Sequence, residues 1–295
     1  YSFINIYYWL ARNKFCGLTR NSMYREYMDI FYEVHFKYKD QLNIFDLEIL
    51  KQDEVNKSII KKLNPQNKYI VLWKPRCNRW DKSTPIRNSS LDSCLSLFDK
   101  IHSDGGIIFG VLYGSADIKH PGLVDLRQIK EQDIREKFIF YLDATCKYAI
   151  AGQTGGTVPL HIFMKPMLVY DAAYPYTIHF SGPKTIVSLK KSYYPNGQEV
   201  RIETLLALKS QKEIQDLGIK FQPNSAIDIL KLHAELLQRM EENRDEFIPE
   251  SYDMNIDWGE GIPRNIYNRF GHSQIANYCY KTQKKALAPK QLINN

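Results

Sequence analysis

A glycine-rich turn between two apolar segments constrains this chain more than any other feature of its sequence. Residues 148–171 read YAIAGQTGGTVPLHIFMKPMLVYD, which indicates an apolar strand, a turn, a brief helix and a second apolar strand. The turn consists of Gly152, Gln153, Thr154, Gly155, Gly156 and Thr157. Glycines let backbone amides approach a ligand closely, and the following helix directs its positive end to the same space. The pattern predicts a cradle for a phosphate or diphosphate; the alternative is an ordinary tight turn of an α/β domain.

The composition is typical of a globular chain in a reducing compartment. Of the 295 residues, 44% are apolar and 25% are charged. The five cysteines are odd in number and form no Cys-x-x-Cys pair, so we expect free thiols rather than disulfides or a zinc site. No run approaches the roughly 20 apolar residues that span a bilayer. We therefore predict a cytoplasmic protein, with peripheral association at the inner face of the membrane left open. The chain begins at Tyr1 in apolar sequence, and we expect further residues upstream.

The formal net charge of +7 suits an anionic partner. Nucleotides, anionic lipid surfaces and acidic glycans all attract lysine and arginine. No nucleic-acid-binding motif accompanies the charge, so a nucleic acid is not an expected partner. The sequence also contains no Ser-His-Asp arrangement and no metal-spaced cluster, which argues against a hydrolase or a metalloenzyme and predicts neither a metal nor a cofactor.

The middle of the chain alternates apolar strands with amphipathic helices. Strands are predicted at residues 69–73 and 107–113, in addition to the two that flank the turn. Helices are predicted over 45–63, from Ser89 or Ser90 to about Ile101, and around 134–142. Such alternation implies a parallel sheet with helices on both faces. Further along, Pro195-Asn196-Gly197 predicts a hairpin turn, and a helix begins at 224–225 with capping-box spacing.

This pattern divides the chain into three parts. Residues 1–44 form an aromatic and basic N-terminal segment that we expect to be helical, with packing inside the protein favoured over a membrane-interface role. Residues 45–249 form the α/β domain. Residues 250–295 form a polar C-terminal extension.

Several stretches of the α/β domain resemble a bacterial family of glycosyltransferases in the GT-B superfamily. The matching stretches are Arg87-Asn88-Ser89 before a helix, a glycine-bounded aliphatic strand at 105–114, the strand–turn–strand of 146–170, and the later segments 185–203 and 218–240. In order and spacing, the resemblance covers roughly residues 45–245.

The resemblance implies a Rossmann-like domain that binds a nucleotide sugar, with the turn at 152–157 around the diphosphate. In such domains ligands bind outside the carboxyl ends of the strands, at a topological switch point. Residues 1–44 would then close an N-terminal acceptor domain. The implied reaction moves a sugar to a glycan or lipid-linked acceptor in bacterial surface polysaccharide synthesis, and it needs no metal because helix dipoles and cations stabilise the leaving diphosphate.

Basic and polar residues near the predicted strand ends complete the candidate site. Lys74 and Arg76 follow the strand at 69–73, where a cation would face phosphate or belong to a solvated basic loop. Arg87 and Asn88 would contact the donor or cap the next helix. Lys190 lies on the predicted hairpin, where solvent exposure is the alternative.

Two residues are candidates for catalysis, Arg76 as the cation at the leaving group and Asp171 as the base or a ribose ligand at a strand end. The chain also departs from the family, since it reads Trp73-Lys74-Pro75-Arg76 where the family has a His-Val-Arg-Asp type of sequence. These departures motivate the alternative of a catalytically silent subunit that binds nucleotide or glycan. A nicotinamide-dependent oxidoreductase is disfavoured because GQTGGT lacks GxGxxG spacing.

Overall fold

The computed structural model describes the α/β domain with several gaps. It covers residues 53–76, 85–112, 118–157, 159–160, 163, 165–173, 185–201, 204–205, 208, 211–242 and 274–275. The N-terminal segment 1–44, which we predict to be helical, therefore lies outside the described residues. The extension 250–295 also lies outside them, except for the short strand at 274–275.

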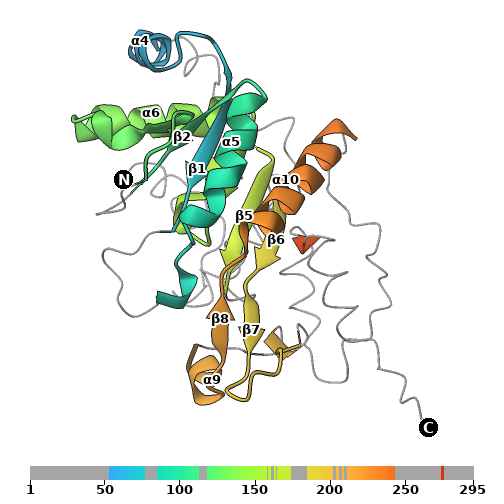
Figure 1. The fold of residues 1–295 in the computed structure, drawn as a ribbon. Coiled ribbons are helices and arrows are strands. Elements are labelled where there is room, and N and C mark those ends of the chain that lie inside the picture. The colour runs from blue at the N-terminus through green and yellow to red at the C-terminus, as the bar shows by residue number, and fades with distance from the viewer. Residues whose placement is uncertain are drawn as a thin grey trace, which may run out of the picture. The chain divides into compact units, whose positions relative to one another are not determined.

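A parallel β-sheet forms the centre of the described part (Figure 1). Its strands are β1 (Tyr69–Lys74), β2 (Gly106–Gly110), β3 (Leu123–Asp125), β4 (Tyr148–Ala151), β5 (Met167–Ala172), β6 (Thr185–Leu189) and the two-residue β9 (Gln274–Ile275). Their order is β3-β2-β1-β4-β5-β6-β9, and every neighbouring pair is parallel. This arrangement confirms the predicted Rossmann-like α/β fold.

Five α-helices and four 3₁₀ turns accompany the strands in the described ranges. The α-helices are α4 (Glu54–Leu63), α5 (Leu95–Ser103), α6 (Gln132–Thr145), α9 (Gln211–Asp216) and α10 (Ala226–Glu241). The 3₁₀ turns are η1 (Pro85–Arg87), η2 (Asp92–Cys94), η3 (Leu126–Gln128) and η4 (Gly155–Thr157). The predicted capping box is confirmed at the start of α10, where Ser225 and Asp228 exchange hydrogen bonds.

Alternating side chains of the central strands build two hydrophobic cores, one on each face of the sheet. Leu72 and Met167 belong to the core that α6 covers, and α4 packs against the same core. Trp73 and Ile150 belong to the opposite core, which α5 and α10 cover. Because both faces are buried, these strands read as continuous apolar runs, which explains why the sequence indicates a parallel sheet.

The strand order reverses between β1 and β4, and this point is the topological switch of the sheet. The chain runs outward from β1 to β2 and β3, returns to β4, and then continues in the other direction. The connection after β1 contains α5, whereas the connection after β4 places Leu160 in the core on the opposite face. In open sheets of this kind, ligands bind at the carboxyl ends of the two strands on either side of the reversal.

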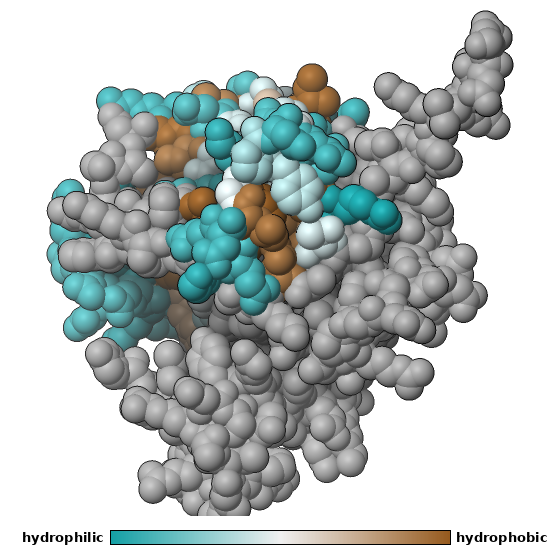
Figure 2. All heavy atoms as spheres, turned by 90° about the horizontal axis from the view of Figure 1, so that it is seen from below, coloured by the Kyte–Doolittle hydropathy of each residue, from teal (hydrophilic) through white to brown (hydrophobic). Residues whose placement is uncertain are grey.

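A small antiparallel sheet, β7 (Lys191–Tyr193) with β8 (Lys220–Gln222), extends from the carboxyl end of β6. The turn predicted at Asn196-Gly197 is present, and Gly197 adopts a left-handed φ of 83°. With α9, this sheet encloses a third hydrophobic cluster that includes Val200 and Ile214. In Figure 2, which views the molecule from this end, hydrophobic side chains lie among hydrophilic ones.

One predicted helix start differs from the structure. The sequence places the N-cap of the helix that follows β1 at Ser89 or Ser90, but η2 intervenes and α5 begins at Leu95. The backbone N–H of Ser90 instead donates to the Asp171 carboxylate, so a tertiary contact takes the place of a cap. The predicted apolar face of the helix is confirmed by buried Cys94, Phe98 and Ile101.

Candidate functional site

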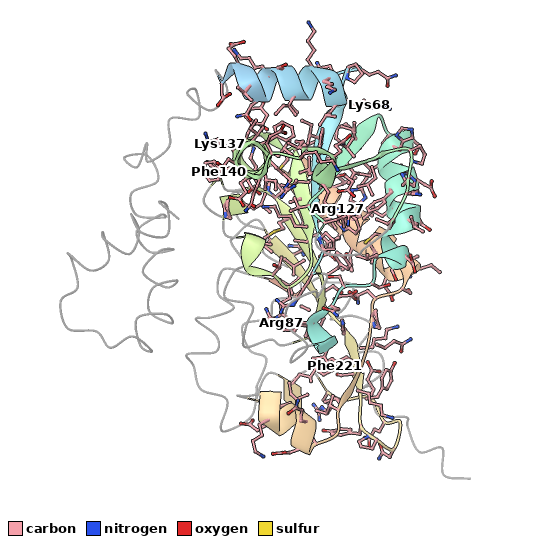
Figure 3. The ribbon with its side chains drawn as sticks, turned by 90° about the vertical axis from the view of Figure 1, so that its left-hand side faces the viewer. Lys68, Arg87, Arg127, Lys137, Phe140 and Phe221 are labelled. Atoms are coloured by element: carbon pink, nitrogen blue, oxygen red, sulfur yellow. The ribbon has the colours of Figure 1, made fainter. Side chains whose placement is uncertain are left out.

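The carboxyl ends of β1, β4, β5 and β6 bring the candidate residues together from four separate parts of the chain. Segment 85–90 crosses these strand ends and is bonded to each of them. Figure 3 shows Arg87 of this segment at the end of the main sheet that faces the small sheet, where Phe221 is labelled. Ile86 packs against the cluster of the small sheet, so the segment links both parts.

The outer half of the glycine-rich turn presents backbone amides to an open space. Gly155 and Gly156 are exposed, and a Cβ on Gly155 would have no heavy atom within 4 Å. No described residue accepts a hydrogen bond from the N–H of Thr154 or of Gly155. Neither Gly155 nor Gly156 has a positive φ. The turn therefore does not need glycine here for its backbone conformation, and the missing side chains instead leave room for a ligand to approach the backbone.

The inner half of the turn has a structural role. A Cβ on Gly152 would lie 2.2 Å from Ser89 Oγ and 2.6 Å from the backbone N of Arg76, so only glycine lets segment 85–90 approach β4 this closely. The buried Gln153 side chain accepts a hydrogen bond from the backbone N–H of Ala173 through Oε1 at 3.0 Å. The Thr157 hydroxyl is buried and donates to the carbonyl of Thr154 at 2.9 Å.

Two of the predicted cations converge beside the turn. Arg76 Nη1 and Arg87 Nη2 both donate to the carbonyl of Gln153, at 3.3 Å and 3.1 Å. Both side chains belong to partly exposed residues, so their positive charge reaches the space over the turn. Asn88 adjoins them, and its Oδ1 is a buried atom without a hydrogen-bond partner among the described residues.

Lys190 is buried and holds segment 85–90 in place. Its Nζ donates to the carbonyls of Ile86 and Asn88 at 2.7 Å and 2.6 Å. Burial lowers the pKa of Lys190, and the nearby Asp171 carboxylate partly offsets this shift. The sequence predicts a contact between this lysine and phosphate, whereas the structure places its ammonium on backbone carbonyls within the protein.

Asp171 is enclosed as well. It is fully buried and adopts a left-handed φ of 56°. Its Oδ2 accepts the N–H of Ser90 at 2.7 Å, and its Oδ1 accepts the N–H of Asn224 at 2.6 Å. Burial raises the pKa of Asp171, and the two backbone donors and the charge of Lys190 counteract that rise. This geometry favours a role in joining three segments over the predicted contact with substrate.

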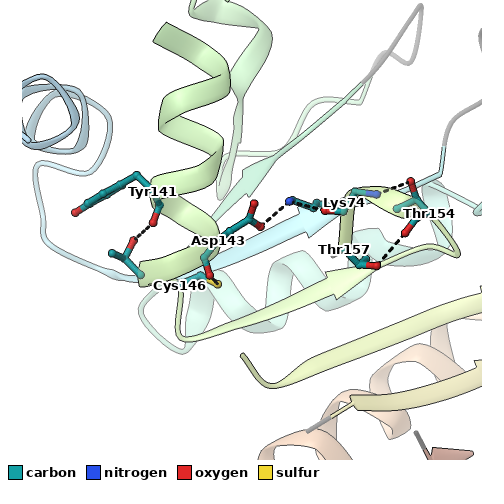
Figure 4. A network of polar contacts seen from close by, with 8 residues as sticks. Lys74, Tyr141, Asp143, Cys146, Thr154 and Thr157 are labelled. Atoms are coloured by element: carbon teal, nitrogen blue, oxygen red, sulfur yellow. Dashed lines mark hydrogen bonds and ion pairs between the residues drawn. The ribbon is translucent and has the colours of Figure 1, made fainter. Parts of the chain in front are cut away.

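Lys74 lies on the buried side of the turn, between Asp143 and the turn residues Thr154 and Thr157 (Figure 4). Its Nζ lies 2.5 Å from Asp143 Oδ1 and 2.8 Å from the carbonyl O of Gly156. The two side chains are 6% and 2% exposed. Burial raises the pKa of Asp143 to about 6, although the adjacent Lys74 opposes the shift. Sequence reasoning did not identify Asp143; its only signal is an acidic residue next to the buried Leu142 in an amphipathic helix.

A buried Tyr148–His233 pair lies elsewhere in the domain. The tyrosine hydroxyl is 2.7 Å from His233 Nε2, and burial lowers the pKa of the histidine to about 4. At neutral pH the imidazole is therefore uncharged, and its contact with Tyr148 lies within the core of the domain.

Within the described ranges, no group of three or more His, Cys, Asp or Glu residues is arranged to hold a metal ion. None of the helices in these ranges combines the length and the apolar character that a membrane crossing requires. Neither a protein-family model, nor a curated protein, nor a solved structure matches the chain.

Proposed function

We propose that the α/β domain binds the diphosphate of a nucleotide sugar at the switch point between β1 and β4 and transfers the sugar to a glycan or lipid-linked acceptor. The observation that carries this proposal is the outer half of the turn, where the N–H groups of Thr154 and Gly155 have no acceptor among the described residues, beside the guanidinium groups of Arg76 and Arg87. Backbone amides and paired guanidinium groups are the donors from which phosphate oxygens best accept hydrogen bonds.

The proposed chemistry needs stabilisation of negative charge rather than a covalent intermediate. When the sugar leaves, charge grows on the diphosphate, and donors already aimed at it lower the barrier. The turn amides and the two arginines supply these donors without a metal. We propose that the reaction takes place on the cytoplasmic side of a bacterial membrane, with the acceptor supplied as a membrane-attached or soluble glycan.

Arg76→Ala should reduce turnover about 100-fold while nucleotide affinity changes far less, because the charge that Arg76 meets develops mainly in the transition state. Arg76→Lys should recover only part of the activity, since an ammonium cannot make the two-pronged guanidinium contact. The measurement is release of nucleoside diphosphate from UDP-, GDP- and ADP-sugars with a bacterial glycan or lipid extract as acceptor.

Arg127→Ala is the matched control, because Arg127 follows β3, two strands away from β1, and is paired with Asp125 at the end of that strand. This variant should keep wild-type turnover. Equal activity of wild type and Arg76→Ala would contradict the role of Arg76.

A second function, a silent subunit that binds a nucleotide without transfer, is favoured by the burial of Asp171. Both carboxylate oxygens already accept backbone N–H groups, so the predicted base is not available to an acceptor hydroxyl in this conformation. Wild-type protein that binds nucleoside diphosphate but releases none from any of the sugar donors would support this function.

A further inference from the structure

The buried ion pair beneath the turn is an unexpected element of this fold. Lys74 is the last residue of β1 and Asp143 lies in the last turn of α6, and both are almost completely shielded from water. Removal of two charges from water costs about as much free energy as their attraction returns, so an apolar pair of similar size would stabilise the domain equally well. A gain in stability therefore does not explain why this ion pair is present, and we consider its effect on the geometry of the turn.

The geometric effect of Lys74 is to fix one peptide group of the turn. Its Nζ draws the carbonyl of Gly156 inward, and Asp143 holds the ammonium at that point. The described residues contain no cis peptide, so the Gly156 carbonyl points away from the N–H of the next residue. An outward carbonyl at this position would place a partial negative charge on the exposed side of the turn, where it would repel an anion.

We propose that Lys74 and Asp143 are positioning residues for anion binding, which keep the Gly156 carbonyl turned away from a diphosphate on the outer face of the turn. This inference rests on the proposed function of the turn. Lys74 then acts through the backbone and does not touch the ligand.

The double variant Lys74→Met with Asp143→Leu tests this inference, with stability and anion binding measured separately. Because the charges are removed together, the melting temperature should stay within about 5 °C of wild type. The affinity for inorganic pyrophosphate, measured by calorimetry, should fall at least about tenfold, since nothing then holds the Gly156 carbonyl inward. The matched control is Lys212→Met with Asp216→Leu, which removes an exposed pair on α9 and should bind as wild type does. A folded Lys74/Asp143 double variant with wild-type affinity would overturn the inference.

Asp143→Asn decides the question if the double variant does not fold. Asparagine keeps an oxygen that accepts from Lys74 Nζ but lacks the charge that holds the ammonium in place, so pyrophosphate affinity should fall about threefold, less than in the double variant. A folded Asp143→Asn protein with wild-type affinity would contradict the positioning role of Asp143.

Hydrogen exchange distinguishes a failure of this inference from a failure of the proposed function. If wild type binds neither pyrophosphate nor a nucleoside diphosphate, the proposed function is wrong, but the turn geometry is still tested. The Thr157 amide, which donates to the Thr154 carbonyl at 3.4 Å, should exchange at least about tenfold faster in the double variant than in wild type. Unchanged exchange at Thr157 would overturn the inference.

Discussion

Asp171→Ala should lower the free energy of unfolding by about 3–5 kcal/mol, the range for removing one partner from a buried charged network. The substitution leaves the N–H groups of Ser90 and Asn224 without their acceptor and the buried Lys190 without its counter-charge. Alanine also tolerates the left-handed φ of this position poorly. Denaturant unfolding followed by circular dichroism measures the loss.

Asp171→Asn is the matched control for this prediction. Asparagine tolerates a left-handed φ and keeps one acceptor oxygen, so its effect should be clearly smaller than that of alanine. If the alanine variant loses less than about 0.5 kcal/mol, the range of an ordinary surface change, Asp171 does not join the three segments as described.

Gly152→Ala should destabilise the domain by about 3 kcal/mol, at the upper end of the usual cost of overpacking. The added methyl group would overlap both Ser89 Oγ and the backbone N of Arg76, and the backbone atom cannot move without displacing β1. The loss is read from the shift of the denaturation midpoint.

Gly155→Ala provides the comparison within the same turn. A Cβ there has open space and an ordinary φ, so stability should change by less than about 1 kcal/mol in either direction. Similar effects of the two substitutions would contradict the division of the turn into a structural half and a ligand-facing half.

The sequence predicts the sheet well because its signals are local. The apolar runs at β1 and β4 and the amphipathic faces of α5 and α6 are each contained in about a dozen residues, and the alternation of strands and helices then implies parallel pairing. The turn at 152–157 is identified for the same reason, since glycine and threonine mark it without knowledge of any partner.

The roles of the charged residues could not be predicted, because their partners are distant in sequence. Lys74 meets Asp143 across 69 positions, and Asp171 meets Ser90 across 81. A lysine at a strand end has the same local sequence whether it faces a ligand or is buried beneath a turn. Only the path of segment 85–90 over the strand ends shows that Lys190 and Asp171 hold the backbone, while Arg76 and Arg87 remain partly exposed.

The most direct test of nucleotide binding at this turn is a titration of the ¹⁵N-labelled protein with uridine, guanosine and adenosine diphosphate, followed by amide NMR. At least one of these nucleotides should give saturable shifts that are largest at the amides of Thr154, Gly155 and Gly156. Gly155→Val should abolish these shifts and leave the rest of the spectrum intact, because its side chain fills the open space over the turn. Saturable binding that leaves these three amides unchanged, or no binding of any of the three nucleotides, would contradict the account.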